Sequence, residues 1–231
     1  MTQTFRAVIF LFGLSATVCA QGPPSAAGQT GANQTQEPPG GKHAFGVISN
    51  YATADASEEG TVLTAKQKFT IAAKDSFGYP VVVLSAALAG IGQLTDREPS
   101  FGQGVKGFAH RLATNYADQS IDTMFTQGVY PVLLHEDSRY FRRGAGSVLS
   151  RTGYALSRMM VTHKDAGGWG FNYSEWLGDA SAVAISNAYY ADDRTPGANS
   201  KKLLMQVGTD GLSAVLKEFW PDIRRKVLHK K

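Results

Sequence analysis

Apolar residues recur every three or four positions from Thr64 to Phe219, and this is the spacing of amphipathic helices. Strict alternation of apolar and polar residues, which marks a half-buried strand, is not sustained in any segment. Hydrophobic residues make up 43% of the 231, enough for one sizeable core. We therefore predict an all-α fold, a compact bundle of six or seven helices behind a disordered leader.

Capping and proline signals set the ends of the predicted helices. Thr64 and Gln67 have the form of a capping box, and Pro80 should end or kink the first helix. Asn172 is a second N-cap signal, and Pro221 is expected to stop the last helix. The predicted helical segments are 64–79, 81–94, 100–116, 121–134, 147–162, 172–190 and 199–219.

Glycine is frequent, with 25 of 231 residues, and an average protein contains roughly 7%. Small residues also stand four apart within several predicted helices, which would let two helix backbones approach closely. These small-residue ridges are Ala86 with Gly90, Gly153 with Ser157, and the series Ala180, Ala184, Ala188.

The first 20 residues have the three parts of a secretory signal peptide. Arg6 gives a positive start, an apolar run covers 7–14, and Val18 and Ala20 are the small residues before the cleavage site. A membrane anchor is the weaker alternative, because the apolar run is short for a span. Cleavage after Ala20 removes Cys19, the only cysteine, and so excludes thiol catalysis, cysteine-zinc sites and disulfides. We expect an exported protein of the periplasm or outer envelope.

The rest of the chain divides by composition. Residues 21–63 read as a flexible leader with a short apolar patch at 44–51, residues 64–223 as the helical domain, and residues 224–231 as a basic tail. From Thr64 onward there are 21 Lys and Arg against 15 Asp and Glu. The tail is either a solvated terminus, which is the commoner case, or a contact for anionic lipid. The chain contains no nucleic-acid-binding motif, so we expect no nucleic-acid partner.

The densest polar cluster begins at the end of the fourth predicted helix. His135 could act as a general base assisted by Glu136 or Asp137, with Arg139 beside them, and these four residues are the candidate catalytic site of a hydrolase. Adjacent helical residues point about 100° apart, so they cannot all face one ion. A salt-bridged helix end is the alternative that we favour.

A second set of charges lies on two successive predicted helices. Arg151 and Arg158 share one face of the first helix, and Glu175 and Asp179 share one face of the second. If these helices pack antiparallel, buried arginine–carboxylate pairs could join them. The alternative is a binding cleft lined by aromatic residues near the loop between them: Trp169, Tyr173 and Trp176.

Five stretches, KQKFTIAAKDSFGYP, HEDSRYFRRG, SRTGYALSR, FNYSEWLGDA and LKEFWPDI, resemble a group of signal-peptide-bearing bacterial envelope proteins without an established activity. The resemblance implies an envelope location and assigns no catalytic residue. No nucleophile elbow, His-Glu-x-x-His motif or phosphate-binding glycine loop is present, so the sequence names no cofactor and no metal ligand. We expect a non-enzymatic envelope protein that contacts a membrane surface or another envelope protein, with the hydrolase as the alternative.

Overall fold

A computed structural model of the chain describes residues 53–55 and 61–228. By its contacts the chain divides into the units Met1–Thr35 and Gln36–Lys231, and every described residue belongs to the second unit. The predicted signal peptide, the apolar patch at 44–51 and most of the predicted leader lie outside the described residues. The last three residues of the predicted tail also lie outside them.

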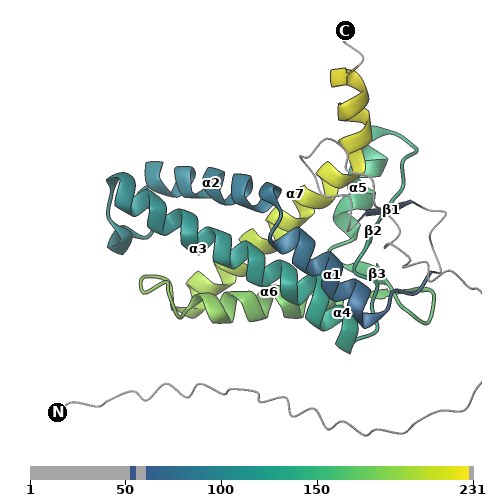
Figure 1. The fold of residues 1–231 in the computed structure, drawn as a ribbon, viewed down its shortest axis with the longest axis horizontal. Helices are drawn as coiled ribbons and strands as arrows, with labels where there is room; N and C mark the ends of the chain where they lie inside the picture. Colours follow the sequence, from purple (N-terminus) through teal and green to yellow (C-terminus); the bar gives the residue numbers. More distant parts are fainter. Residues whose placement is uncertain (1–52, 56–60, 229–231) are drawn as a thin grey trace, which may run out of the picture. The chain divides into compact units, whose positions relative to one another are not determined.

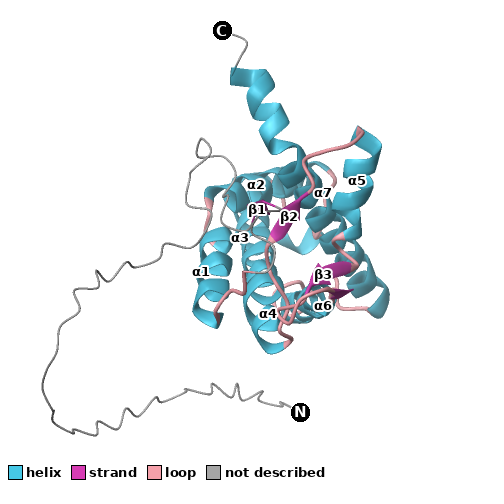
Figure 2. Cartoon of the chain, turned by 90° about the vertical axis from the view of Figure 1, so that its right-hand side faces the viewer, coloured by secondary structure: helices cyan, strands magenta, loops and turns pink. Residues whose placement is uncertain are grey.

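Helices make up most of the described chain, as Figure 2 shows by colour, and the all-α prediction is confirmed. The described helices are α1 (Ala65–Ser76), α2 (Tyr79–Leu94), α3 (Gly104–Met124), α4 (Tyr130–Leu133), α5 (Val148–Ser157), α6 (Tyr173–Ser186) and α7 (Pro196–Leu228). A 3-10 turn, η3 (Pro99–Phe101), precedes α3, and a π-helical turn, η4 (Phe125–Val129), joins α3 to α4.

Four three-residue strands also occur in the described chain, and they form two small pairs. Strand β1 (Thr53–Asp55) runs parallel to β2 (Tyr140–Arg142), and β3 (Val161–His163) runs antiparallel to β4 (Trp169–Phe171). These strands are too short to show a period in the sequence, which is why the prediction did not include them.

The start of the helical domain follows the predicted signals closely. The Thr64 side chain accepts a hydrogen bond from the Gln67 backbone, and the Gln67 side chain accepts one from the Thr64 backbone, so the capping box is complete. Pro80 occupies the first turn of α2, and the axes of α1 and α2 differ by 44°. Pro80 therefore marks the predicted interruption.

The predicted break between residues 116 and 121 is wrong, because α3 runs through it into η4 and α4. The polar residues of this stretch interrupt the apolar pattern, yet they are buried and partnered. The Ser120 hydroxyl donates to the Ser76 carbonyl of α1 at 3.0 Å, and the Ser76 hydroxyl donates to the Ser120 carbonyl at 3.2 Å. Side-chain hydrogen bonds between helices thus replace apolar contacts here.

The last helix is longer than predicted. Helix α7 continues through Pro221 to Leu228, so the expected stop at this proline is wrong, and the start of the predicted basic tail is helical. Pro221 removes one backbone donor inside the helix. The exposed pair between Arg225 and Asp222, at 2.6 Å, adds a contact across the next turn.

Close helix packing occurs on other residues than the sequence suggested. Helix α6 buries Ser174, Gly178, Ala182 and Ser186, which form a small-residue ridge displaced by two positions from the predicted alanines. A Cβ on Gly178 would lie 2.4 Å from the Thr126 methyl group and 2.9 Å from its backbone nitrogen. The predicted ridges at 180–188, 90 and 153 are wrong, because Ala180, Ala184 and Ala188 are exposed and Gly90 and Gly153 face open space.

Figure 1 shows α2 lying along α3, with α6 on another side of α3. Helix α7 packs against both α5 and α6, so α3, α6 and α7 meet around one region of the interior. None of the described helices is both long and apolar enough to span a membrane alone. Helices α1 and α2 meet that test of length and composition only as a bent pair.

Candidate metal centre

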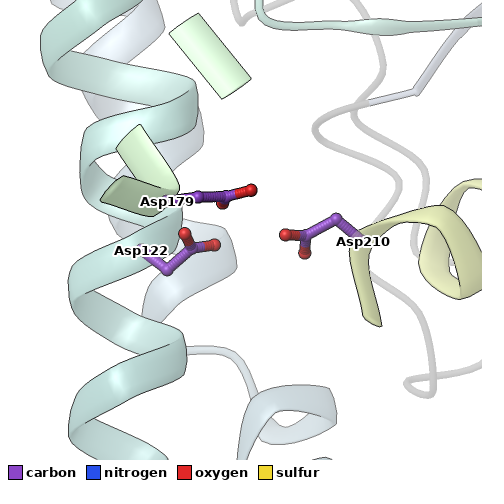
Figure 3. A group of neighbouring side chains, drawn as sticks. All are labelled: Asp122, Asp179 and Asp210. Atoms are coloured by element: carbon purple, nitrogen blue, oxygen red, sulfur yellow. The ribbon is translucent and has the colours of Figure 1, made fainter. Parts of the chain in front are cut away.

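Three aspartates from three helices meet where α3, α6 and α7 converge. Asp122 belongs to α3, Asp179 to α6 and Asp210 to α7, and Figure 3 shows their carboxylates facing one another. One carboxylate oxygen from each residue lies within 4.8 Å of the other two. No cysteine or histidine takes part in this group, so its donors are all oxygen atoms.

Local features of the backbone place two of these aspartates. Gly178 lets α6 approach Thr126 of η4 closely, and Asp179 is the next residue along α6. Asp122 lies in the last turn of α3, immediately before η4 begins. The π-helical turn widens the helix by one residue per turn, and such turns occur frequently at functional sites. A close contact and an irregular turn therefore bring the carboxylates together.

Asp122 and Asp179 are buried and Asp210 is half-buried, and four of the six carboxylate oxygens have no hydrogen-bond donor. The side chains of Asp122 and Asp179 are 2% and 0% exposed. Both carboxylate oxygens of Asp179 accept no hydrogen bond, and neither do Oδ1 of Asp122 and Oδ2 of Asp210. Buried polar atoms in folded proteins are nearly always partnered, so these oxygens call either for protons shared between the carboxyl groups or for a partner from outside the protein.

Burial raises the pKa of each of these carboxyl groups. Burial is the largest cause at Asp122, and together with the charges of Asp210 and Asp179 it raises the pKa of this residue well above its ordinary value. Burial, followed by the charges of Asp210 and Glu175, raises the pKa of Asp179 to about 8, and burial raises the pKa of Asp210 to about 7. Carboxyl groups in this setting hold either protons or a cation near neutral pH.

Glu175 and Lys217 complete the charged surroundings. Glu175 lies one turn before Asp179 on α6, and its Oε1 is buried without a hydrogen-bond partner. Burial, and then the charges of Asp210 and Asp122, raise the pKa of Glu175 well above its ordinary value. Lys217 on α7 partly counters burial by lowering the pKa of Asp210. Lys217 thus counters burial at Glu175 and Asp210.

The structure places the four predicted catalytic residues in a different environment. His135 is exposed, with its backbone in the left-handed region at φ +54°. Glu136 is fully buried, accepts from Lys164 Nζ at 2.5 Å, and accepts from the Ser174 backbone nitrogen at 2.9 Å at the start of α6. Asp137 accepts from Arg139 Nη2 at 2.7 Å. Glu136 and Asp137 are therefore engaged in ion pairs, and a hydrolase centred on these residues stays a prediction.

The three histidines in the described part of the chain, His110, His135 and His163, have different neighbours. The His110 ring stacks on Phe101 with 3.8 Å between ring centroids. The His163 ring lies against Phe141 and Trp169, at 4.4 Å and 3.6 Å. The His135 side chain is exposed, and the His135 carbonyl accepts from the Asp165 backbone nitrogen at 2.8 Å. This arrangement does not assemble a histidine site.

The predicted arginine pairs with Glu175 and Asp179 do not form. Arg151 instead pairs with α7, where its Nε donates to Glu218 at 2.8 Å and its Nη1 to Asp222 at 2.6 Å. Arg158 lies over the Trp169 ring, with 4.2 Å from its guanidinium carbon to the ring centroid. The expectation is wrong because α5 packs on α7, which carries carboxylates of its own.

Half of the cluster had a signal in the sequence. Glu175 and Asp179 are one helical turn apart on a predicted helix, which is the spacing of two ligands on one face. Asp122 and Asp210 lie on helices that are distant in the sequence, and only the packing of α3 and α7 against α6 brings them there. No protein-family model, curated protein or solved structure matches the chain.

Proposed function

We propose that this protein binds a divalent cation through Asp122, Asp179 and Asp210, with Glu175 as a further ligand. The observation that carries this proposal is the set of buried carboxylate oxygens without hydrogen-bond donors, above all both oxygens of Asp179. A cation would supply the missing partner for all of these oxygens at once. It would also offset the repulsion between the carboxylates, which burial strengthens.

The donor set favours a hard cation. Carboxylate oxygens are the ligands of Ca²⁺ and Mg²⁺, whereas softer metals prefer histidine or cysteine. Two oxygens on opposite sides of a Ca²⁺ ion lie about 5 Å apart, twice the usual bond length. Oxygens within 4.8 Å of one another can therefore share one Ca²⁺, whereas Mg²⁺ requires a tighter, nearly ideal octahedron. Ca²⁺ is the first cation to test.

Thermal unfolding of the full chain tests this proposal. A cation that binds only the folded state at one hundred times its Kd adds about 2.7 kcal/mol to the free energy of unfolding. We expect Ca²⁺ to raise the Tm relative to EDTA, and Asp179→Asn to abolish that rise. Asp192→Asn is the matched control, because Asp192 is exposed and outside the cluster. Equal Tm values in Ca²⁺ and EDTA would contradict the proposal.

The second candidate function is contact with a membrane surface, as expected of an exported envelope protein. Helix α2 supports it: none of its 16 residues is charged, and Val83, Ile91 and Leu94, which share one face, are 62%, 57% and 89% exposed. The outer face of a helix in water is normally polar. An apolar face of this length suits insertion at the boundary between lipid headgroups and acyl chains.

Vesicle flotation tests this second candidate. We expect the chain to float with phospholipid vesicles, and the double variant Ile91→Asp and Leu94→Asp to stay with the soluble fraction. Leu149→Asp on α5 is the control, since Leu149 is equally apolar and 83% exposed but lies on another helix. Flotation that is lost equally in the control would contradict a specific role for α2.

Export itself is tested at the N-terminus of the protein isolated from cells. Cleavage at the predicted signal-peptide site leaves Gln21 as the first residue. A cell-associated protein that retains Met1 in the cytosolic fraction would contradict the envelope location.

The hydrolase alternative has less support. Its two acidic residues, Glu136 and Asp137, already accept from Lys164 and Arg139, and its histidine is exposed. A general base requires a free lone pair within reach of a substrate. The cation site is therefore the function that the geometry favours.

A further inference from the structure

A cavity of about 570 Å³ lies beside the acidic cluster and extends between α2 and α7. We infer that this cavity binds an amphiphile whose anionic head, a phosphate or a carboxylate, completes the coordination of the cation. The apolar chain of the amphiphile would lie between α2 and α7. The inference rests on the proposed cation site, and it names the class of ligand that this site serves.

The size of the cavity exceeds the needs of a metal ion. One water molecule takes about 30 Å³ of liquid volume, and a cation with a few waters would fill only a small part of this space. Pockets that hold small organic ligands have volumes of about 300–1,000 Å³. The cavity falls within that range, so the cation and a ligand can occupy it together.

The lining of the cavity is divided into two kinds of surface. Asp122, Asp210 and Glu175 contribute acidic groups. The side contributed by α2 is apolar and includes Val81, Leu84 and Ala87. A ligand that fits this division has one polar head and one apolar body.

The rim of the cavity is apolar on both sides. Val83 of α2 and Leu212 and Leu216 of α7 line the cavity, and they are 62%, 57% and 42% exposed. Apolar side chains that surround an opening leave apolar surface in contact with water. A hydrocarbon chain that enters between α2 and α7 would cover this surface.

Two further polar groups on the cavity wall favour an anionic head. Nη1 of Arg158 is buried and has no hydrogen-bond partner, and the Ser174 hydroxyl, on a residue only 2% exposed, has none either. The Arg158 carbonyl accepts from Asn172, the N-cap of α6, and the guanidinium lies over the Tyr154 and Trp169 rings. A cation-bound oxyanion that reached Nη1 would give this nitrogen the partner that it lacks.

Calorimetric titration of the full chain with dodecyl phosphate, below its micelle concentration, tests this inference. We expect binding in millimolar CaCl₂ to be at least about tenfold tighter than in EDTA. Arg158→Gln should weaken binding about tenfold, and the control Arg225→Gln, on an exposed arginine outside the cavity, should leave it unchanged. Dodecanoate replaces dodecyl phosphate in a second arm, which distinguishes a carboxylate head from a phosphate head.

Two variants separate this inference from the cation site. Ala87 is exposed and lines the cavity, so Ala87→Trp should fill the space for the chain and abolish dodecyl phosphate binding while Ca²⁺ still binds. Asp179→Asn should abolish both. Ca²⁺ binding without binding of either amphiphile would overturn the inference and leave the cation site standing. Equal binding in EDTA, or binding of dodecyltrimethylammonium alone, would overturn it as well.

Discussion

Helix α7 contributes buried carboxylates to two regions of the molecule, and the protein treats them in opposite ways. Glu218 is fully buried against α5 and β2, where it accepts from Arg151 Nε at 2.8 Å and from the Tyr140 hydroxyl at 2.9 Å. The backbone nitrogens of Gly144 and Arg143 donate to it at 2.9 Å and 3.0 Å. Each oxygen of Glu218 therefore has at least two donors.

Asp210 lies about two turns earlier on the same helix, where it faces the carboxylates of Asp122 and Asp179. Lys217 only partly offsets the effect of burial there. Burial acts to raise the pKa of Glu218, but the hydrogen bonds, that of Arg151 first, lower it overall. At Asp210 the effect of burial prevails, and the pKa is raised. The two sites share a helix and differ in their donors.

Two other buried charged residues resemble Glu218, because each has several partners within the protein. Lys68 donates to two backbone carbonyls and to Asp165, and Arg111 donates to the carbonyls of Arg97, Gly102 and Glu98. The acidic cluster differs from these residues, because four of its carboxylate oxygens have no donor. A cation is the partner that would make it comparable to the sites of Glu218, Lys68 and Arg111.

The largest expected effect comes from removing Arg151, the charged partner of Glu218. Arg151→Ala would leave Glu218 buried without its charged partner, and breaking a buried pair in this way costs about 3–5 kcal/mol. Urea denaturation followed by circular dichroism measures the loss. Arg225→Ala is the control, because its pair with Asp222 is 69% exposed on the arginine side and contributes at most about 1 kcal/mol. Similar losses in the two variants would contradict the ranking.

The second prediction concerns pH and the unpaired region. The native pKa values of Asp179 and Asp210 lie above their unfolded values near 4, so the stability they provide is greatest in acid and is lost as pH rises through about 7 to 8. In EDTA, we expect the free energy of unfolding to fall between pH 5 and pH 8. Each carboxyl group that is still protonated in the folded state and already ionised in the unfolded state lowers the free energy of unfolding by about 1.4 kcal/mol per pH unit.

Urea titrations at several pH values measure this slope. The double variant Asp179→Asn and Asp210→Asn should flatten it, and Ca²⁺ should flatten it in the native sequence by holding the carboxylates ionised. A slope that is the same in the double variant would show that other groups cause it.

The third prediction tests the contact that positions Asp179. Gly178→Ala would force the new Cβ against Thr126, including its backbone nitrogen at 2.9 Å, and overpacking of this kind costs about 1–3 kcal/mol. We also expect weaker Ca²⁺ binding, because α6 would shift away from η4. A variant with native stability and native affinity would contradict the positioning role of this glycine.

The smallest expected effect has the opposite sign. Gly153 lies inside α5, and no atom lies within 4 Å of the position that an added Cβ would take, so Gly153→Ala should raise the free energy of unfolding by about 0.5–1 kcal/mol. The comparison with Gly178→Ala, under the same urea conditions, separates a glycine needed for packing from one that is not. A loss of stability at Gly153 would restore the ridge that the sequence predicted there.

Features that depend on neighbouring residues could be predicted from the sequence. Features that depend on contacts between distant helices could not. The capping box at Thr64 and the interruption at Pro80 depend on a few adjacent residues, and both are confirmed. The continuity of α3 depends on Ser120 meeting Ser76 of another helix, and this pairing has no periodic signature.

The acidic cluster shows the same limit. The sequence places Glu175 and Asp179 on one helix face, and from it we predicted that they pair with Arg151 and Arg158. Arg151 finds Glu218 and Asp222 instead, so the carboxylates of α6 meet those of α3 and α7. Only the order of helix packing decides between these two outcomes, and the periodicity of each helix does not contain it.

Equilibrium dialysis of the full chain against Ca²⁺, with metal content measured by atomic spectroscopy, tests the central claim most directly. We expect one Ca²⁺ per chain, lost in Asp122→Asn and in Asp179→Asn and retained in Asp192→Asn. A native chain that retains no more Ca²⁺ than these two cluster variants would contradict the cation site.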